Sequence, residues 1–381
     1  MPVPAPFPAE AEPDGPAITE LKRRRGSGAS GPWRLVAARF LRQRVATAAC
    51  GLVLLLYLVG AFAEFLAPGV PDASKPQYGY APPQPLHLLA AIPHAEGYRT
   101  EVDRASLRRT FVPDDNRSVP VGWFVQGAPY RLWGLVPMTT HLFGPLRPSD
   151  PFFLLGADRL GRDLLTRLIY GTRVSMSIGL AGVATSLVLG VVLGALAGFY
   201  GGWVDTLIGR VIEVVSAMPT IPLWLGLAAA IPLTWSPVSV YFVITLIVSL
   251  LGWTSLAREV RGRFLALRTE DFVLAARLDG AGQRRVIFRH ILPSLTSHIL
   301  AVVTLAVPTM IVAETSLSFL GIGLKPPVVS WGVLLQDAQN IRTVATAPWL
   351  LAWPAGAVVL AVLGFNFLGD GLRDAADPYG D

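Results

Sequence analysis

The residues of this chain that are able to do covalent or metal chemistry are few, and their context does not fit an ATP-hydrolysing or thiolate-metal site. The three lysines, Lys22, Lys75 and Lys325, are neither preceded by Gly nor followed by Ser or Thr, so the phosphate-binding Walker A loop is missing. The single cysteine, Cys50, excludes an intramolecular disulfide and a thiolate metal cluster. The chain therefore cannot be an ATPase by itself.

Histidines and carboxylates between residues 67 and 160 are the remaining candidates for catalysis. They are His87, His94, His141, Asp103, Asp114, Asp115 and Asp150. None of these histidines lies at metal-ligand spacing from another, and no Gly-x-Ser-x-Gly nucleophile motif occurs in this region. We therefore expect no catalytic residue, no metal site and no cofactor bound by this chain, and a membrane-bound enzyme is the weaker alternative.

Two glutamates in or beside apolar segments are candidates for transport chemistry, because ionisable residues in membrane helices are usually functional. Glu213 follows Arg210 by one helical turn, which favours a structural ion pair, and Pro219 predicts a bend shortly afterwards. Glu314 precedes Ser318, and two roles are equally favoured for it: contact with substrate or a gate, and capping of the next segment. We predict that Glu213, Pro219, Glu314 and Ser318 belong to a translocation path or gate.

The most informative stretch is polar and arginine-rich, covers residues 270–293, and lies between two long apolar runs. Its small, turn-forming and helix-ending residues are Ala275, Ala276, Asp279, Gly280, Ala281, Gly282, Leu292 and Pro293. Small side chains permit close approach of another surface, and Gly280 favours a tight turn. Pro293 is expected to end a second helix. The pattern predicts a helix, a turn and a second helix that together form a docking loop.

The composition indicates which kind of secondary-structure element positions the residues described above. Of 381 residues, 52% are hydrophobic and 15% are charged, whereas soluble proteins carry about 25% charged residues. Six apolar runs are each long enough to cross about 30 Å of hydrocarbon. They are Val45–Leu66, Val174–Phe199, 204–231, Val238–Leu256, Leu295–Ala313 and Ala347–Leu368. The net charge of +6 comes from arginines beside these runs, so we expect no nucleic-acid partner.

The arginine distribution predicts the orientation of the chain. Residues 1–32 are expected to form a disordered cytoplasmic tail that ends in a basic cluster, and residues 33–66 an interfacial helix followed by the first span. The second basic segment, 258–293, follows the fourth span and so lies on the same side. Both termini are therefore predicted to be cytoplasmic.

The remaining chain divides into an insert and a core. Residues 67–160 are polar and proline-rich with short β-like runs, and we expect an extracytoplasmic insert that is a structural cap, or a lid or docking surface for a binding protein. Residues 161–381 carry spans two to six. In span two, Gly190, Gly194 and Gly198 recur every fourth residue and predict a smooth face for helix packing.

The 270–293 segment resembles the EAA loop of the inner-membrane permease subunits of ABC importers. The matching residues are Ala275, Ala276, Gly280, Leu292 and Pro293. Leu274 stands where that family usually has Glu, and His290 stands where Ile is usual. The histidine is typical of the peptide and nickel branch, whereas the missing Glu removes one expected polar contact with the ATPase.

Two further stretches resemble the same branch, in the same order along the chain. Leu155–Asp163 is similar to its Leu-Gly-Thr-Asp and Gly-Arg-Asp motifs, with Ala157 in place of Thr. We expect this stretch to form an amphipathic interfacial helix. Leu317–Gly321 is similar to the Leu-Ser-Phe-Leu-Gly motif, and with the Pro-Pro and Trp-Gly pairs that follow it predicts a half-helix and re-entrant turn.

The resemblance implies an all-α membrane fold of the type I ABC importer permease class, with six transmembrane helices. It implies half of a translocation path for peptides or a related solute such as nickel, in a bacterial or archaeal cytoplasmic (inner) membrane. The implied partners are a second permease, two cytoplasmic ATPases that hydrolyse ATP with Mg²⁺, an external solute-binding protein and membrane lipid. An ion-coupled secondary transporter is the alternative, and it would need exchangeable acids at mid-membrane.

Overall fold

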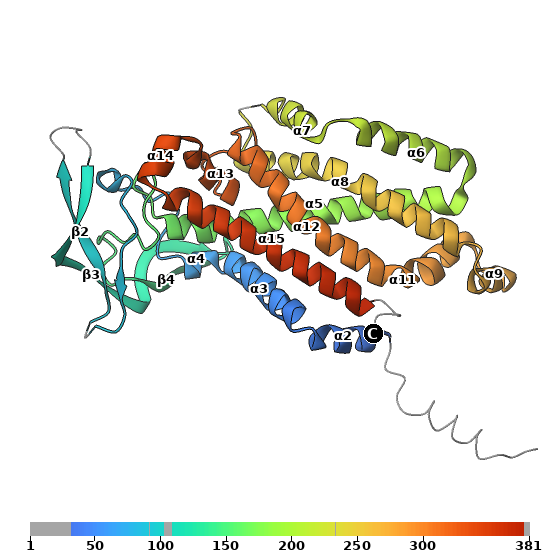
Figure 1. The fold of residues 1–381 in the computed structure, drawn as a ribbon, viewed down its shortest axis with the longest axis horizontal. Helices are drawn as coiled ribbons and strands as arrows, with labels where there is room; N and C mark the ends of the chain where they lie inside the picture. The colour runs from blue at the N-terminus through green and yellow to red at the C-terminus, as the bar shows by residue number, and fades with distance from the viewer. Residues whose placement is uncertain (1–31, 91, 103–108, 233, 377–381) are drawn as a thin grey trace, which may run out of the picture.

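The computed structural model describes residues 32–90, 92–102, 109–232 and 234–376. Long helices lie side by side along the molecule, and a small β-sheet covers one end of them (Figure 1). Five helices are long and apolar enough to span a membrane. They are α3 (Arg44–Ala61), α5 (Leu164–Tyr200), α8 (Pro237–Leu267), α12 (Thr296–Phe319) and α15 (Trp349–Ala376). The predicted tail lies outside the described residues except for Pro32.

A bent pair of helices supplies the candidate for the sixth span. The helices α6 (Gly202–Ala217) and α7 (Thr220–Ala229) meet at an angle of 86°. Met218, between them, is extended because it precedes Pro219, and residues before proline avoid the helical conformation. The interruption predicted at Pro219 is therefore present, and the described residues contain five candidate spans, or six if the bent pair counts as one of them.

The glycine face of α5 packs against α8, as its spacing predicts. A Cβ atom on Gly194 would lie 2.6 Å from the carbonyl oxygen of Ala257, and one on Gly198 would lie 2.6 Å from Cβ of Phe264. The two helices approach so closely that only glycine fits at these positions. This contact fixes α8 against α5 along much of their length.

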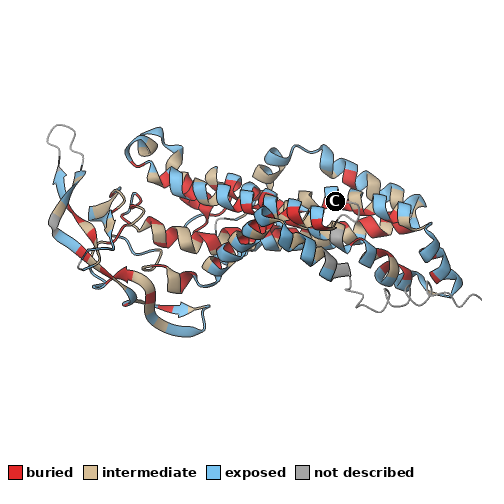
Figure 2. Cartoon of the chain, turned by 60° about the horizontal axis from the view of Figure 1, so that its bottom comes forward, coloured by how far each residue is buried: buried red, intermediate tan, exposed pale blue. Residues whose placement is uncertain are grey.

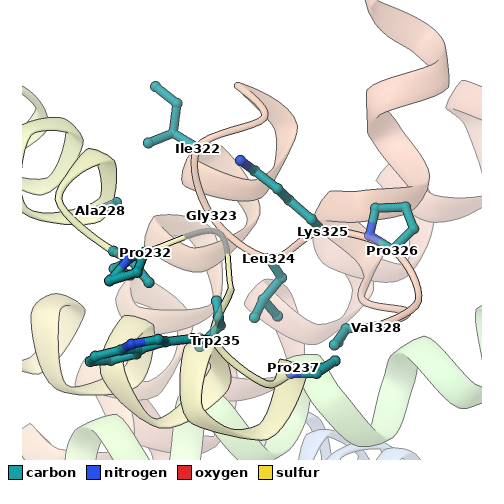
Figure 3. Close-up of a pocket in the computed structure, with 12 residues that line it drawn as sticks. Ala228, Pro232, Trp235, Pro237, Ile322, Gly323, Leu324, Lys325, Pro326 and Val328 are labelled. Carbon is teal, nitrogen blue, oxygen red and sulfur yellow. The ribbon is translucent and has the colours of Figure 1, made fainter.

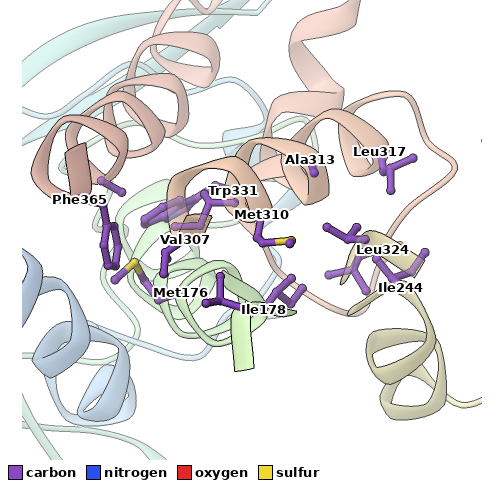
Figure 4. Packing of buried hydrophobic residues seen from close by; sticks show 14 of the residues in the cluster. Met176, Ile178, Ile244, Val307, Met310, Ala313, Leu317, Leu324, Trp331 and Phe365 are labelled. Atoms are coloured by element: carbon purple, nitrogen blue, oxygen red, sulfur yellow. The ribbon is translucent and has the colours of Figure 1, made fainter. Parts of the chain in front are cut away.

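The central hydrophobic cluster lies where α5, α8, α12 and α15 meet (Figure 4). Met176, Met310 and Phe365 are among its buried members, and Trp331, from the segment after α12, closes it. Buried residues concentrate along the helix contacts, while much of the outer surface is exposed (Figure 2). The exposed outer faces are apolar on several spans, as lipid-facing surfaces are.

The insert forms a sheet, which corrects the all-α expectation. Its strands are β1 (Leu86–His87), β2 (His94–Val102), β3 (Arg109–Leu132) and β4 (Val136–Pro145), paired antiparallel in that order. The first half of β3 pairs with β2 and its second half with β4. This segment lacks the long apolar runs of the spans, and its alternating β-rich stretches pair with one another instead.

Short elements connect the spans at both ends. They are α2 (Pro32–Arg42), α4 (Ala63–Leu66), η1 (Pro76–Tyr78), α9 (Asp271–Leu278), α10 (Gln283–Arg285), η2 (Val286–Ile291), α11 (Leu292–Ser294), α13 (Trp331–Leu335), η3 (Gln336–Gln339) and α14 (Ile341–Thr346). The helix α9 lies at the end of the molecule farthest from the sheet (Figure 1). The helix α2 and the described C-terminal end also lie away from the sheet.

Candidate functional site

The 270–293 segment has the predicted helix and turn, and the turn is closed by backbone hydrogen bonds. Gly280 has φ +82°, a conformation that side chains beyond glycine rarely adopt. The N–H of Ala281 donates to the carbonyl of Ala276 at 2.9 Å, and the N–H of Gly280 donates to that of Arg277 at 3.0 Å. This pair of bonds is a Schellman motif, which ends α9 sharply.

The second helix of the segment differs in detail from the prediction. It is built from α10, a single π-helical stretch η2 and α11, and it continues past Pro293 to Ser294. A turn at Leu295 separates it from α12. Proline removes one backbone donor, so it interrupts the helix rather than ending it, and the chain resumes as span five at Thr296.

The inner side of the segment is fixed to the ends of two spans. Val273 and Ile291 are buried in a cluster with Phe199 of α5 and Phe264 of α8. The guanidinium of Arg277 lies 5.3 Å from the centroid of the Phe199 ring, a cation–π contact. The segment is therefore continuous in packing with α5 and α8.

The segment exposes four large apolar side chains, Phe272, Leu274, Leu278 and Phe288, which we together call the α9 patch. Leu278 is 88% exposed, and Arg284, Arg285 and Arg289 are exposed nearby in the chain. Exposed apolar patches rimmed by polar residues mark contacts with other molecules. Phe272, Leu278 and Phe288 were not among the docking residues predicted from the sequence. The four-residue spacing of Leu274 and Leu278 was an available signal, because it places both on one face of a helix.

The predicted docking residues divide between the two sides. Ala275, Asp279, Gly280, Gly282 and Pro293 are exposed. Ala281 and Leu292 are partly buried. Ala276 is buried, so its small side chain allows α9 to pack on its own chain rather than on an outside surface.

Glu314, in α12, is fully buried, and its carboxylate accepts hydrogen bonds from three serines. Ser318 donates to its Oε1 at 2.7 Å, Ser330 donates to the same atom at 2.8 Å, and Ser175 of α5 donates to Oε2 at 3.4 Å. The serine hydroxyls in turn accept backbone N–H bonds from Leu324, Val333 and Trp331. Glu314 thus joins α5, α12 and residues 324–333, which follow α12, through its serine partners.

The predicted path residues do not gather into one site in this chain. Glu213 pairs with Arg210 at 2.8 Å, with both side chains exposed on α6, and Pro219 is exposed at the bend. Glu314 and Ser318 are buried at the sheet end of α12. The ion pair favoured for Glu213 is present.

A cavity of about 170 Å³ lies beside the bent pair (Figure 3). Its wall includes Ala228 at the end of α7, Pro237 at the start of α8, and the 322–328 segment, with Trp235 on one side. Lys325 is charged, and the other described lining residues are apolar. None of the four predicted path residues lines it.

The 155–163 segment is a closed turn, not the predicted amphipathic helix. Gly156 and Gly161 have φ of +87° and +70°, which interrupt helical geometry. The buried Asp158 carboxylate accepts from the N–H of Arg162 at 3.0 Å and from its Nε at 2.7 Å, and it also pairs with buried Arg167. The carboxylate stabilises the turn by satisfying donors that a helix would have used elsewhere.

Asp163 begins α5 and marks the end of this turn. Its carboxylate accepts from the backbone N–H of Thr166 at 2.8 Å and from the hydroxyl of Thr166 at 2.6 Å, an N-cap arrangement. Its other oxygen is buried without a partner. Burial raises the pKa of Asp163 to about 6, although the Thr166 bonds act in the opposite direction.

Metal binding has no candidate among the side chains that the structure describes. Groups of three or more His, Cys, Asp or Glu able to hold an ion do not occur there. His87 pairs with Glu96 at 2.7 Å and stacks on His94, while His141 is buried and contacts two backbone carbonyls. The three histidines therefore make structural contacts.

Two family models match the chain. Residues 190–379 match the binding-protein-dependent transport system inner membrane component, and residues 31–83 match the N-terminal TM domain of oligopeptide transport permease C. The chain belongs to the first family. The sheet, residues 86–145, lies between the two matched ranges.

Several relatives agree with this assignment. The oligopeptide transport system permease protein OppC of Bacillus subtilis is 37% identical over 63% of this chain and 76% of its own length. The dipeptide transport system permease protein DppC of Alkalihalophilus pseudofirmus is 38% identical over 58% of this chain and 71% of its own length. The glutathione transport system permease protein GsiD of Pectobacterium atrosepticum is 38% identical over 61% of this chain and 74% of its own length.

Family membership confirms several predictions. The chain is a multi-pass inner-membrane component of a binding-protein-dependent transport system, and the predicted resemblance to ABC importer permeases is correct. Members of this family are transport subunits, not catalysts, which confirms that the chain is not an enzyme.

Proposed function

We propose that this chain is the permease subunit of an ATP-driven importer of peptides and forms half of the translocation path. The three relatives described above are named for oligopeptides, dipeptides and glutathione, all of which are peptides. That common chemistry supports a peptide rather than nickel as the solute. The chain itself binds neither ATP nor Mg²⁺; its two ATPase partners do.

The observation that carries the proposal is the two-sided packing of the 270–293 segment. Its inner side is buried against α5 and α8, and its outer side exposes the α9 patch at the end away from the sheet. An ATPase docked on this patch would move α9, and the packing would pass that movement to the two spans. Residues 258–293 therefore act as the coupling loop.

The α6–α7 layer supports a second permease as partner. Among the residues of α6, all of which the structure describes, Ile212 alone is buried. The Arg210–Glu213 pair is exposed on this layer. An exposed ion pair is costly in lipid, so this face is proposed to lie against the second permease or along the path. The network around Glu314 is proposed to hold the gate at the sheet end closed.

The proposed orientation follows the arginine distribution. Residues 1–32, the coupling loop and the C-terminus lie in the cytoplasm, residues 33–66 form the interfacial helix and first span, and the insert, residues 67–160, faces outside. The core, residues 161–381, carries the remaining spans. The sheet is then on the side where a solute-binding protein delivers its peptide.

The test is ATP-driven uptake of a labelled peptide by proteoliposomes that contain the full complex. Leu278→Asp replaces an exposed apolar side chain in the α9 patch, and losing its burial against the ATPase weakens docking by about 2 kcal/mol, roughly thirtyfold. Leu89→Asp, at a fully exposed leucine of the insert, is the matched control and keeps normal uptake. Equal uptake by both variants contradicts the coupling assignment.

A glycine pair tests the shape of the same loop in this assay. Gly280→Ala and Gly282→Ala both add a methyl group in open space, but Gly280 has φ +82° and Gly282 has φ −66°. The first change strains the turn by about 1–2 kcal/mol, whereas the second does not. We expect reduced uptake for Gly280→Ala alone, with both variants inserted normally in the membrane.

A further inference from the structure

The hairpin between β3 and β4 has an apolar and exposed tip. The tip, residues 133–137, reads Trp-Gly-Leu-Val-Pro and contains no charged residue. Leu135 is 77% exposed, and Trp133 and Val136 are exposed as well. Hairpin turns in water favour Gly, Asn, Asp and Ser, and an exposed apolar group of this kind marks a contact surface.

Two hydrogen bonds fix this hairpin to the end of the first span. The indole Nε1 of Trp133 donates to the carbonyl oxygen of Ala61, the last residue of α3, at 2.7 Å. Nδ1 of His141 lies 2.6 Å from the carbonyl oxygen of Ala67, which follows α4. As the chain leaves the membrane from Ala61 to Ala67, β4 therefore runs in the same direction beside it. The tip is the membrane-proximal end of the hairpin.

Charged contacts show where the apolar part of the first span ends. Arg173 of α5 donates from Nε to the carbonyl of Gly60 at 2.7 Å and forms an ion pair with Glu64. The tip lies beside this level, because Trp133 bonds to Ala61, between Gly60 and Glu64. It therefore lies at the boundary between hydrocarbon and water.

The exposed surface of the span continues into the tip. Leu55 and Leu58 are exposed on α3, and the rings of Phe62 and Trp133 are in contact, with centroids 5.5 Å apart. Trp133 has φ +53°, an outlier for a bulky residue, so the backbone is held in a strained conformation that presents this side chain to Phe62 and Ala61.

We propose that the tip, residues 133–137, is inserted into the lipid leaflet at the sheet end of the spans and anchors the insert to the membrane. Tryptophan favours the membrane interface, where its ring lies in an apolar layer and its N–H finds a partner. Arg131, exposed two residues before Trp133, is placed to reach lipid phosphates. Lipid is favoured over a protein partner because the apolar surface is continuous with a membrane span.

This anchor attaches the insert to the lipid itself, in addition to its covalent links to α4 and α5 and its hydrogen bonds to the end of the first span. The sheet is then held at a fixed tilt on the membrane, with β2 farther from the helices than β4 (Figure 1). The inference depends on the membrane location of the chain and does not depend on the coupling loop or the transported solute.

The experiment uses the assembled complex in lipid nanodiscs without its binding protein. In a Cys50→Ser background, Leu135→Cys is labelled with an environment-sensitive fluorophore, and Val136→Cys is a second probe of the tip. Thr100→Cys, exposed on β2, is the matched control. Quenching is measured with aqueous iodide and with phosphatidylcholine that carries a doxyl group near its headgroup.

Membrane insertion predicts a blue-shifted emission at both tip sites, quenching by the doxyl lipid, and an iodide quenching constant several-fold lower than at Thr100. Two results overturn the proposal. Iodide quenching equal to that at Thr100 places the tip in water. Protection from iodide without quenching by the doxyl lipid shows that protein, not lipid, covers the tip.

Discussion

At the scale of single residues, buried carboxylates determine how the sheet end of this chain is held together. Asp158 satisfies the donors of a turn, Glu314 gathers three serines, and Asp163 caps α5. Asp163 differs from the other two because one of its oxygens is buried without a partner. The charged form of this group is therefore poorly compensated, and protonation relieves the cost.

The pH dependence of stability tests this view of Asp163. Its pKa is raised from 3.8 to about 6, chiefly by burial, and the nearby Asp158 carboxylate acts in the same direction. Because the folded pKa lies above the unfolded one, this group stabilises the folded chain below about pH 4. That contribution is lost as the pH rises to about 6.

The comparison uses Asp163→Asn, which keeps an N-cap side chain but cannot titrate. We expect the melting temperature of the variant relative to wild type to rise by a few degrees between pH 4.5 and pH 7.5, measured by intrinsic fluorescence. The control, Asp72→Asn at an exposed position, shows no such change. A constant difference for Asp163→Asn across this range would show that its carboxylate does not titrate differently on folding.

At the scale of elements, close helix packing makes α5 and α8 one unit. Gly194→Ala places a methyl group 2.6 Å from the carbonyl oxygen of Ala257, so α5 and α8 must separate, at a cost of about 1–3 kcal/mol. Gly262→Ala, on α8 where a methyl group meets open space, removes flexibility and stabilises by about 0.5–1 kcal/mol. The two variants are expected to shift the melting temperature in opposite directions, and equal shifts would contradict the packing argument.

The spans and the break at Pro219 were predictable because each depends on its own local sequence. Apolar length sets a span, and proline interrupts a helix wherever it occurs. The turn at 155–163 was not predictable, since it depends on Arg167 and on two glycine conformations that spacing does not reveal. The α9 patch was not predicted for a similar reason. The burial of Val273 decides which face of α9 stays exposed, and the residues that bury Val273 lie on distant spans.

At the scale of the whole molecule, the α9 patch and the sheet lie at opposite ends of the spans (Figure 1). In the proposed orientation, the arginine-rich segment around α9 follows the positive-inside rule, whereas Arg159, Arg162 and Arg167 at the sheet end run against it. The structure removes much of this conflict. Arg162 and Arg167 pair with Asp158, and Arg159 lies 3.5 Å from Asp337, so these arginines are substantially compensated.

Sidedness is therefore the most direct test of the orientation. In the Cys50→Ser background, Leu278→Cys marks the α9 patch and Leu89→Cys marks the insert, and both positions are highly exposed. A membrane-impermeant maleimide should label Leu89→Cys in right-side-out vesicles and Leu278→Cys in inside-out vesicles. Permeabilised vesicles, in which both sites react, serve as the control. The reverse pattern would place the arginine-rich segment proposed as the coupling loop outside, where no ATPase could reach it.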